Sequence, residues 1–303
     1  MAPGDSPTIA RRRVRLALRE AREARGLTQS DIAEAMEWSL SKVIRIESGE
    51  VSISPNDLRP LLALLGIRDR ARVDELVADA KASRVRQRVQ WWQEGTFREH
   101  LTPATRRLIE YEREAVAARF FSIFFVPGPL QTREFAEAVL SKWQLGLSPE
   151  DVAIRVEARM RRRQGLLERE KPMHISVLLD ESLVRRPIGG LAVLADQLTD
   201  LMHAIQSGRI NLRIVPFSID APLPNQGAYD IYYLSEDGDD ENAVIYREVA
   251  FTDEIVEDKV KAQEHRTRFD ELWAASMDEE ATIDLVQKRL SEIGVTHQGN
   301  NIK

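Results

Sequence analysis

The chain lacks cysteine and long apolar runs, and both absences exclude classes of protein. Its 303 residues include no cysteine, so they offer no disulfide, no thiol nucleophile and no Cys-ligated metal site. No stretch approaches the roughly 20 apolar residues that cross a bilayer. The start, APGDSPTIARRR, runs from polar to basic without the apolar segment of a secretory signal. We therefore expect a cytoplasmic protein with no membrane partner.

The sequence also lacks the motifs of common active sites. It has no Gly-rich phosphate loop and no serine elbow. None of its five histidines has a histidine partner three or four residues away. We therefore expect no catalytic residues, no bound metal, no cofactor and no enzymatic activity. The rival hypothesis is a C-terminal hydrolase, which a buried carboxylate with a strongly shifted pKa would favour.

What is present is an uneven distribution of charge. The net charge is −6, yet residues 1–90 hold 17 Lys and Arg against 13 Asp and Glu, while the remainder holds 26 against 36. The mild basicity therefore lies at the N-terminal end, as a nucleic-acid contact requires, and the acidity lies in the rest of the chain. The length suggests two domains, and 43% apolar residues suffice for folded cores.

Two short helices with a tight turn are predicted between residues 26 and 47. Gly26 follows a first helix at the position where a left-handed residue is needed. Thr28 caps a helix over 29–36 and forms a capping box with Asp31, and Ser39 caps a helix over 40–47. This arrangement is typical of the motif that lays its second helix in the major groove of DNA.

The segment resembles the xenobiotic-response-element family and the phage repressors. The matching features are Leu18-Arg19, Arg22, Gly26-Leu27-Thr28-Gln29, Ile32-Ala33, Ser39, Val43, Arg45-Ile46-Glu47 and Gly49. The resemblance implies base contacts from Leu40, Ser41, Ile44 and Arg45, and a phosphate contact from Gln29. Thr28 and Lys42 are further candidates for phosphate contacts. The resemblance also implies a structural ion pair between Arg22 and Glu47.

Helical spacing supports the same assignment. Val43 and Ile46 are three residues apart and face the core, which turns the four base-contact candidates outward. Arg45 is the one side chain among them that can hydrogen-bond a guanine edge in a bidentate manner. Ile44 contacts a thymine methyl or packs on its neighbours, and Lys42 contacts a phosphate or is solvated; the sequence leaves both pairs of alternatives open.

The sequence of the second half predicts a mixed α/β domain. The predicted fold class is therefore an all-α, five-helix N-terminal domain followed by a mixed α/β C-terminal domain. The predicted elements are helices over 103–121, 132–143, 149–169, 190–206, 256–275 and 279–293, and strands over 174–179, 210–216, 228–234 and 243–249. The expected domains are 8–75 for DNA binding, a helical linker over 76–97, a sensory or partner-binding domain over 98–293 and a flexible tail over 294–303.

This second half also resembles a known group. FFVPGPLQTREFAEAVL, RMRRRQGLLER, LLDESLVRRPIGG, DQLTDL, LRIVPF and VIYRE are similar to the C-terminal domain of actinobacterial regulators called WhiJ-like or Scr-type antitoxin-like. The resemblance covers residues 95–285 and implies a transcriptional regulator whose partner is double-stranded DNA. Members often accompany a small acidic protein, so an antitoxin of a toxin–antitoxin-like pair is the alternative function.

One arginine-rich helix is the candidate for partner or ligand binding. Arg155, Arg159, Arg162 and Arg163 lie at spacings where like charges repel. The helix has either a solvated face or a surface that binds an anion, a small-molecule ligand or a small acidic partner protein. Arg185 and Arg186, which follow Asp180-Glu181, are further candidates. We expect a homodimer on an inverted repeat, because a weakly basic domain gains affinity when paired.

Overall fold

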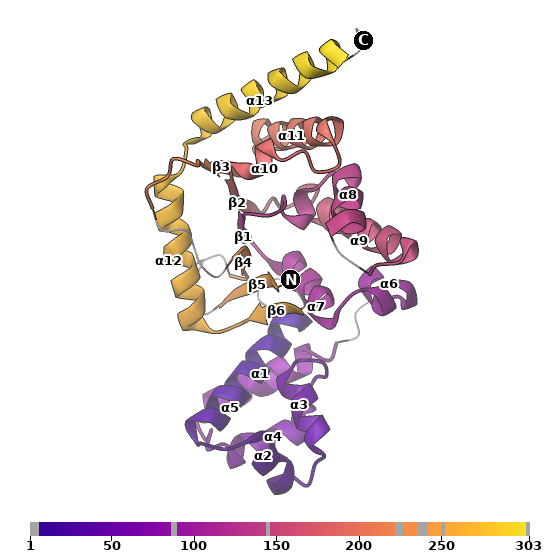
Figure 1. Ribbon diagram of the computed structural model, residues 1–303. Coiled ribbons are helices and arrows are strands. Elements are labelled where there is room, and N and C mark those ends of the chain that lie inside the picture. Colours follow the sequence, from indigo (N-terminus) through magenta and orange to yellow (C-terminus); the bar gives the residue numbers. More distant parts are fainter. Residues whose placement is uncertain are drawn as a thin grey trace. The chain divides into compact units, whose positions relative to one another are not determined.

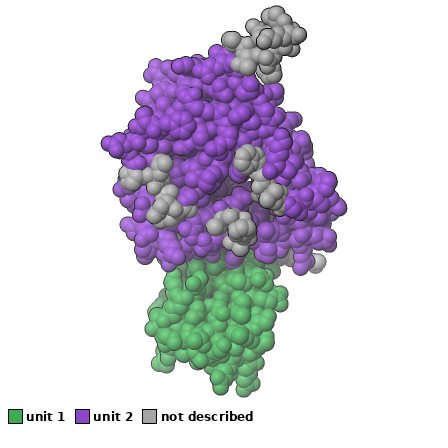
Figure 2. Space-filling model, in the orientation of Figure 1, with its two compact units in different colours: residues 1–88 green, residues 89–303 purple. Residues whose placement is uncertain are grey.

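The computed structural model describes residues 6–85, 90–143, 146–221, 227–235, 242–249 and 252–300. The chain divides into two compact units, residues 1–88 and residues 89–303 (Figure 2). No helix in the described part of the chain is long and apolar enough to cross a membrane.

The described residues of the first unit form five helices, as the fold class predicts. They are α1 (Pro7–Ala24), α2 (Gln29–Ala35), α3 (Leu40–Glu47), α4 (Pro55–Leu64) and α5 (Arg70–Ala82). Leu76, Val77 and Ala80 of α5 are buried in the same core as Leu18 and Leu62. The helix that the sequence places at the start of a linker is therefore the fifth core helix of this unit.

The predicted capping residues are confirmed. The Thr28 hydroxyl accepts the Asp31 backbone N–H, and the Asp31 carboxylate accepts the Thr28 N–H, which completes the capping box. Ser39 caps α3 through the Lys42 N–H. Gly26 has a φ of 65°. Glu37, in the turn between α2 and α3, has a φ of 54°, a conformation that costs a residue with a Cβ about 1–2 kcal/mol.

These two left-handed positions predict opposite effects of exchanging glycine. Gly26→Ala should destabilise the first unit by about 1 kcal/mol, because nothing lies within 4 Å of the added Cβ and only the backbone is strained. Glu37→Gly should stabilise it by about 0.5–1 kcal/mol, part of the relieved strain being offset by the freer unfolded chain. Urea denaturation of residues 1–88 measures both. If both substitutions shifted the free energy of unfolding in the same direction, backbone strain would not be what determines stability at these positions.

The second unit is built on one six-stranded sheet in the order β3-β2-β1-β4-β5-β6. The strands are β1 (Ala117–Ser122), β2 (His174–Asp180), β3 (Asn211–Val215), β4 (Tyr229–Tyr233), β5 (Ala243–Val249) and β6 (Thr252–Val256). Strands β1, β2 and β3 are parallel, and β4, β5 and β6 continue the sheet antiparallel from β1. The mixed sheet confirms the predicted α/β class.

Helices cover both faces of this sheet. Before β1 come the 3-10 turn η1 (Trp91–Gln93), α6 (Gly95–His100) and α7 (Pro103–Glu114); between β1 and β2 come η2 (Gly128–Leu130), α8 (Arg133–Trp143) and α9 (Pro149–Leu167). Helices α10 (Ser182–Arg185) and α11 (Leu191–Gln206) join β2 to β3, and α12 (Lys259–Ala275) and α13 (Glu279–Asn300) close the chain. Within this unit, α12 lies along one face of the sheet and α8, α9 and α11 lie along the other (Figure 1).

Three predicted boundaries differ from the structure. The helix predicted over 103–121 ends at Glu114, and its second half is β1, a central strand buried on both faces whose apolar run lacks the alternation that marks a strand. The edge strand β6 occupies 252–256, where the sequence predicts no strand. Helix α13 continues to Asn300, through most of the expected flexible tail, and residues 301–303 lie outside the described residues.

Candidate nucleic-acid interface

Helix α3 has one buried face and one exposed face. Val43 and Ile46 are 3% and 5% exposed and belong to the core of the first unit. On the other face, Leu40 and Ile44 are 44% and 42% exposed. Ser41 and Arg45 are also exposed. The four residues proposed to contact bases therefore share the outward face of one helix.

The outward row includes two large aliphatic side chains, which would gain free energy if they were buried against a partner. Ile44 keeps 42% of its surface, so it is available for contact with a thymine methyl. The Nε of Arg45 lies 3.5 Å from Oε2 of Glu50, and both side chains are more than half exposed. An exposed pair of this kind contributes little stability, so Arg45 can leave it at small cost.

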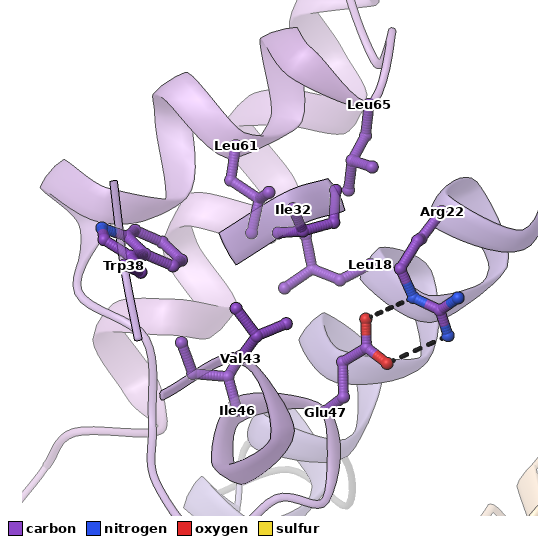
Figure 3. Close-up of a pocket in the computed structure, with 9 residues that line it drawn as sticks. All are labelled: Leu18, Arg22, Ile32, Trp38, Val43, Ile46, Glu47, Leu61 and Leu65. Carbon is purple, nitrogen blue, oxygen red and sulfur yellow. Dashed lines mark hydrogen bonds and ion pairs between the residues drawn. The ribbon is translucent and has the colours of Figure 1, made fainter. Parts of the chain in front are cut away.

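A buried ion pair attaches α3 to α1. The Arg22 Nε donates to Glu47 Oε1 at 2.7 Å and its Nη2 donates to Oε2 at 3.1 Å (Figure 3). The Arg22 Nη1 donates to the Leu27 carbonyl at 2.8 Å, in the turn before α2. The side chains of Arg22 and Glu47 are 12% and 8% exposed. The hydrogen bonds to Glu47 raise the pKa of Arg22 despite its burial.

The proposed phosphate-contact residues lie around this pair. The Gln29 Nε2 donates to Glu47 Oε2 at 2.9 Å, which holds the amide in one orientation and leaves its second N–H for another acceptor. Thr28 is exposed at the start of α2. The Lys42 ammonium lies 3.2 Å from Asp57 Oδ2 and 3.7 Å from the centre of the Trp38 ring. Lys42 is thus held against its own unit, and it is not simply solvated.

Removing one partner of the Arg22–Glu47 pair should lower the free energy of unfolding far more than removing both partners does. Arg22→Ala leaves the Glu47 carboxylate buried with only the Gln29 amide, so it should lower the free energy of unfolding by about 2–4 kcal/mol. The double variant Arg22→Met/Glu47→Leu removes both charges and should recover most of that loss. Chemical denaturation of the three proteins tests this. A double variant no more stable than Arg22→Ala would show that the pair is not the main contribution of these side chains.

The arginine-rich helix of the second unit, α9, faces inward more than the sequence predicts. Arg162 donates to both carboxylate oxygens of Glu112 on α7, at 2.8 and 2.6 Å, and the two side chains are 9% and 7% exposed. Burial opposes the charge of Arg162, but the charge and hydrogen bonds of Glu112 outweigh it and raise the pKa of Arg162. Arg162 therefore belongs to the interior of the unit and not to a docking surface.

The remaining arginine candidates have different surroundings. Arg163 donates to both carboxylate oxygens of Asp200 on α11, at 2.7 and 2.9 Å. Arg159 donates to the Gln131 side-chain oxygen at 2.9 Å, and Arg155 is partly buried on the same helix. Carboxylates of the same unit thus supply part of the opposite charge that the sequence leaves to a ligand or an acidic partner.

Arg185 and Arg186 are both exposed. The Arg185 Nε nevertheless donates to Glu181 Oε1 at 2.7 Å. The Glu181 Oε2 also accepts the Phe217 backbone N–H at 2.9 Å, and Asp180 accepts the Ser182 N–H at 2.9 Å. The Asp180 and Glu181 carboxylates therefore both have partners within the unit.

The polar residues that face α9 were not among the candidates from the sequence. They are Glu112, Gln131, Asp230, Tyr232 and Tyr246. One signal was present in the sequence: Asp230 interrupts the otherwise apolar and aromatic strand YDIYY. Over the residues that the structure describes, no group of three His, Asp or Glu side chains is placed to hold a metal ion.

Two family models match the chain. Residues 14–76 match a helix-turn-helix domain, and residues 105–288 match a domain of unknown function (DUF5753). No curated protein and no solved structure matches the chain. The first match coincides with the unit that carries α3, and the second spans most of the unit built on the sheet.

Proposed function

We propose that this chain, which belongs to the DUF5753 family and carries a helix-turn-helix domain ahead of that domain, is a sequence-specific, DNA-binding transcriptional regulator. The observation that carries the proposal is the exposed row Leu40, Ser41, Ile44 and Arg45 on a helix whose opposite face is buried. A capped, braced helix with such a row has the form of an element that enters the major groove.

Each residue of the row has a role that its chemistry supports. Arg45 offers two parallel N–H donors to O6 and N7 of a guanine. Ile44 and Leu40 offer apolar contact to a thymine methyl, and Ser41 offers a hydroxyl to either kind of base edge. The Gln29 amide, held by Glu47, contacts a phosphate and fixes the register of the helix on DNA. Thr28 and Lys42 are the further phosphate contacts.

Replacing Arg45 separates sequence-specific from general binding. Arg45→Ala should weaken binding to the operator by about 1–3 kcal/mol, or about 5- to 150-fold, and relax the preference at one base pair of each half-site. Gln29→Ala should weaken binding to all sequences alike. The matched control is Arg70→Ala, because the Arg70 side chain is 96% exposed on α5. Fluorescence anisotropy with operator and scrambled duplexes measures all three.

Operator binding by Arg45→Ala at wild-type strength would refute the docking of α3. A loss for Arg70→Ala as large as that for Arg45→Ala would show that overall charge, and not the α3 row, determines affinity.

The protein is proposed to bind an inverted repeat as a homodimer, with the second unit serving as the part that responds to a ligand or a partner protein. The N-terminal 90 residues have an excess of only four positive charges, so release of counterions gives a single copy limited affinity. Linking two copies makes the second contact intramolecular. No catalytic step is assigned to this cytoplasmic regulator.

If the second unit were a hydrolase, Asp230 would be the first candidate for its catalytic carboxylate. Burial raises its pKa to about 8, which is the kind of shift that marks functional groups. Its charge is acted on by Arg162, Glu112 and Glu248, and its carboxylate accepts a hydrogen bond from the Tyr232 hydroxyl at 3.4 Å. Among the described residues, no serine or histidine side chain hydrogen-bonds to it as a nucleophile or a base would. We therefore assign this part of the second unit to binding.

The contribution of the second unit can be measured directly. A fragment of residues 1–88 should bind a two-half-site operator about 100-fold more weakly than the full chain does. On a single half-site, the fragment and the full chain should differ much less. Analytical ultracentrifugation of the full chain with operator gives the number of copies bound. Equal affinity of the fragment and the full chain for the inverted repeat would refute the dimer.

A further inference from the structure

Strands β4 and β5 have one apolar and one polar face. Tyr229, Ile231 and Tyr233 of β4 are buried in a core that includes Phe269 of α12. Because side chains alternate along a strand, Asp230 and Tyr232 lie on the opposite face. Across the ladder, Asp230 pairs with Tyr246 of β5. We define the polar cluster as Glu112, Arg159, Arg162, Asp230, Tyr232 and Tyr246.

Three members of the polar cluster, Glu112, Arg162 and Tyr232, are joined by hydrogen bonds to one another. Glu112 accepts two hydrogen bonds from Arg162, and its Oε1 accepts a third from the Tyr232 hydroxyl at 2.9 Å. Together these groups join α7, α9 and β4. A buried ion pair with its remaining acceptor sites filled is stable and rigid. The role of this half is therefore structural.

Arg159, in the other half, has no bidentate carboxylate partner among the described residues, although the charge of Glu248 on β5 acts on it from a greater distance. No carboxylate lies within ion-pair distance of it among the residues that the structure describes, and its one hydrogen bond there goes to Gln131. A guanidinium has five N–H donors, so most of its donor capacity is unused by those residues. Gln131 is 2% exposed and donates to the Val126 carbonyl at 2.7 Å, which fixes the position of Arg159. Burial lowers the pKa of Arg159 to about 10, so it is still charged at neutral pH.

Two further groups lie on this face of the sheet: Tyr246 is among the groups whose charge acts on Arg159, and Asp230 lies opposite Tyr246 in the β4–β5 ladder. Burial raises the pKa of Asp230 to about 8, so at pH 7 it is a neutral acid that can donate a proton. The Tyr246 hydroxyl makes no hydrogen bond to another residue in the described ranges. Arg159 and Asp230 both retain partial exposure. A fixed guanidinium with O–H donors nearby has the donor set that a carboxylate or an oxyanion requires.

We propose that Arg159, Asp230 and Tyr246 form a binding site for the carboxylate or phosphate group of a small organic anion. This inference rests on the proposed function, because it gives the chemistry of a ligand to which the regulator responds. The site belongs to the second unit, whereas α3 belongs to the first. The turn η2 packs against both guanidinium groups, because a Cβ at Gly128 would lie 3.8 Å from the Arg159 Nε and 3.5 Å from the Arg162 Nη1.

The test is a direct titration of the full-length protein with two probes. Acetate presents a planar carboxylate and sulfate a tetrahedral oxyanion, and chloride at equal ionic strength controls for screening. Isothermal calorimetry at about pH 7 should show saturable binding of at least one probe, and the preference between them distinguishes a carboxylate ligand from a phosphate ligand. Absence of saturable binding by both would overturn the proposal.

Variants locate the bound anion. Arg159→Gln should weaken binding at least about tenfold, since a charged hydrogen bond is lost, and Tyr246→Phe should weaken it several-fold. Arg186→Gln is the matched control, because Arg186 is an exposed arginine of the same unit outside the polar cluster, and it should bind as wild type does. Circular dichroism confirms that each variant is folded. If Arg159→Gln binds as wild type does, or if Arg186→Gln loses binding equally, the site is misplaced.

The pH dependence gives a second readout. The groups that act on Asp230 are Arg162 on α9, Glu112 on α7, Glu248 on β5 and Tyr232 on β4, and Tyr246 also lies opposite it. Ionised Asp230 would repel an anion, so affinity should fall as the pH rises through about 8. Asp230→Asn cannot ionise and should remove that fall. An unchanged pH profile in Asp230→Asn would exclude Asp230 from the site.

The anion site and the DNA-binding proposal can fail separately. Calorimetry requires no DNA, so anion binding that depends on Arg159 would persist even if Arg45→Ala bound operator normally. Conversely, loss of the anion site would leave the operator binding of α3 untouched.

Discussion

The arrangement of the DNA-binding unit depends on how a short helix is held with one face free. Helix α3 has only eight residues, and isolated helices of that length are unstable in water. Its own hydrogen bonds therefore cannot fix its position. The Arg22–Glu47 pair ties the last residue of α3 to α1, and Arg22 also binds the Leu27 carbonyl ahead of α2. One guanidinium thus joins three segments, while the apolar residues Val43 and Ile46 seat the helix on the core.

The second unit contains a similar buried ion pair, but its surroundings differ. Arg162 on α9 forms a bidentate pair with Glu112 on α7, as Arg22 does with Glu47. Here the pair lies against a strand, and the Tyr232 hydroxyl completes it. In the first unit the pair leaves an exposed surface on the far side of the helix. In the second, the same helix carries a further arginine, Arg159, which is partly buried. Burial lowers its pKa to about 10, and hydrogen-bond partners of a buried charge have a large energetic effect.

Prediction from the sequence succeeds where the signals are local. The caps Thr28 and Ser39 and the left-handed Gly26 are determined by residues within three or four positions, and all three were predicted. The outward row of α3 follows from helical spacing once Val43 and Ile46 are placed in the core. The sequence does not predict strand β1, for two reasons. The segment AARFFS lies between neighbouring strands on both sides, and no glycine or proline separates it from the amphipathic helix α7 before it.

The arginines of α9 show the limit of such prediction most clearly. Arg159 and Arg162 are the same residue type, three positions apart on one helix, and a sequence pattern treats them alike. Their different environments come from Glu112, 50 residues away, which lies beside Arg162 and not within ion-pair distance of Arg159. Local repulsion between arginines is visible in the sequence, but the carboxylate that relieves it is visible only in the fold. Among the described residues, no carboxylate binds Arg159 directly, and Arg159 is therefore the arginine of α9 that points to a ligand.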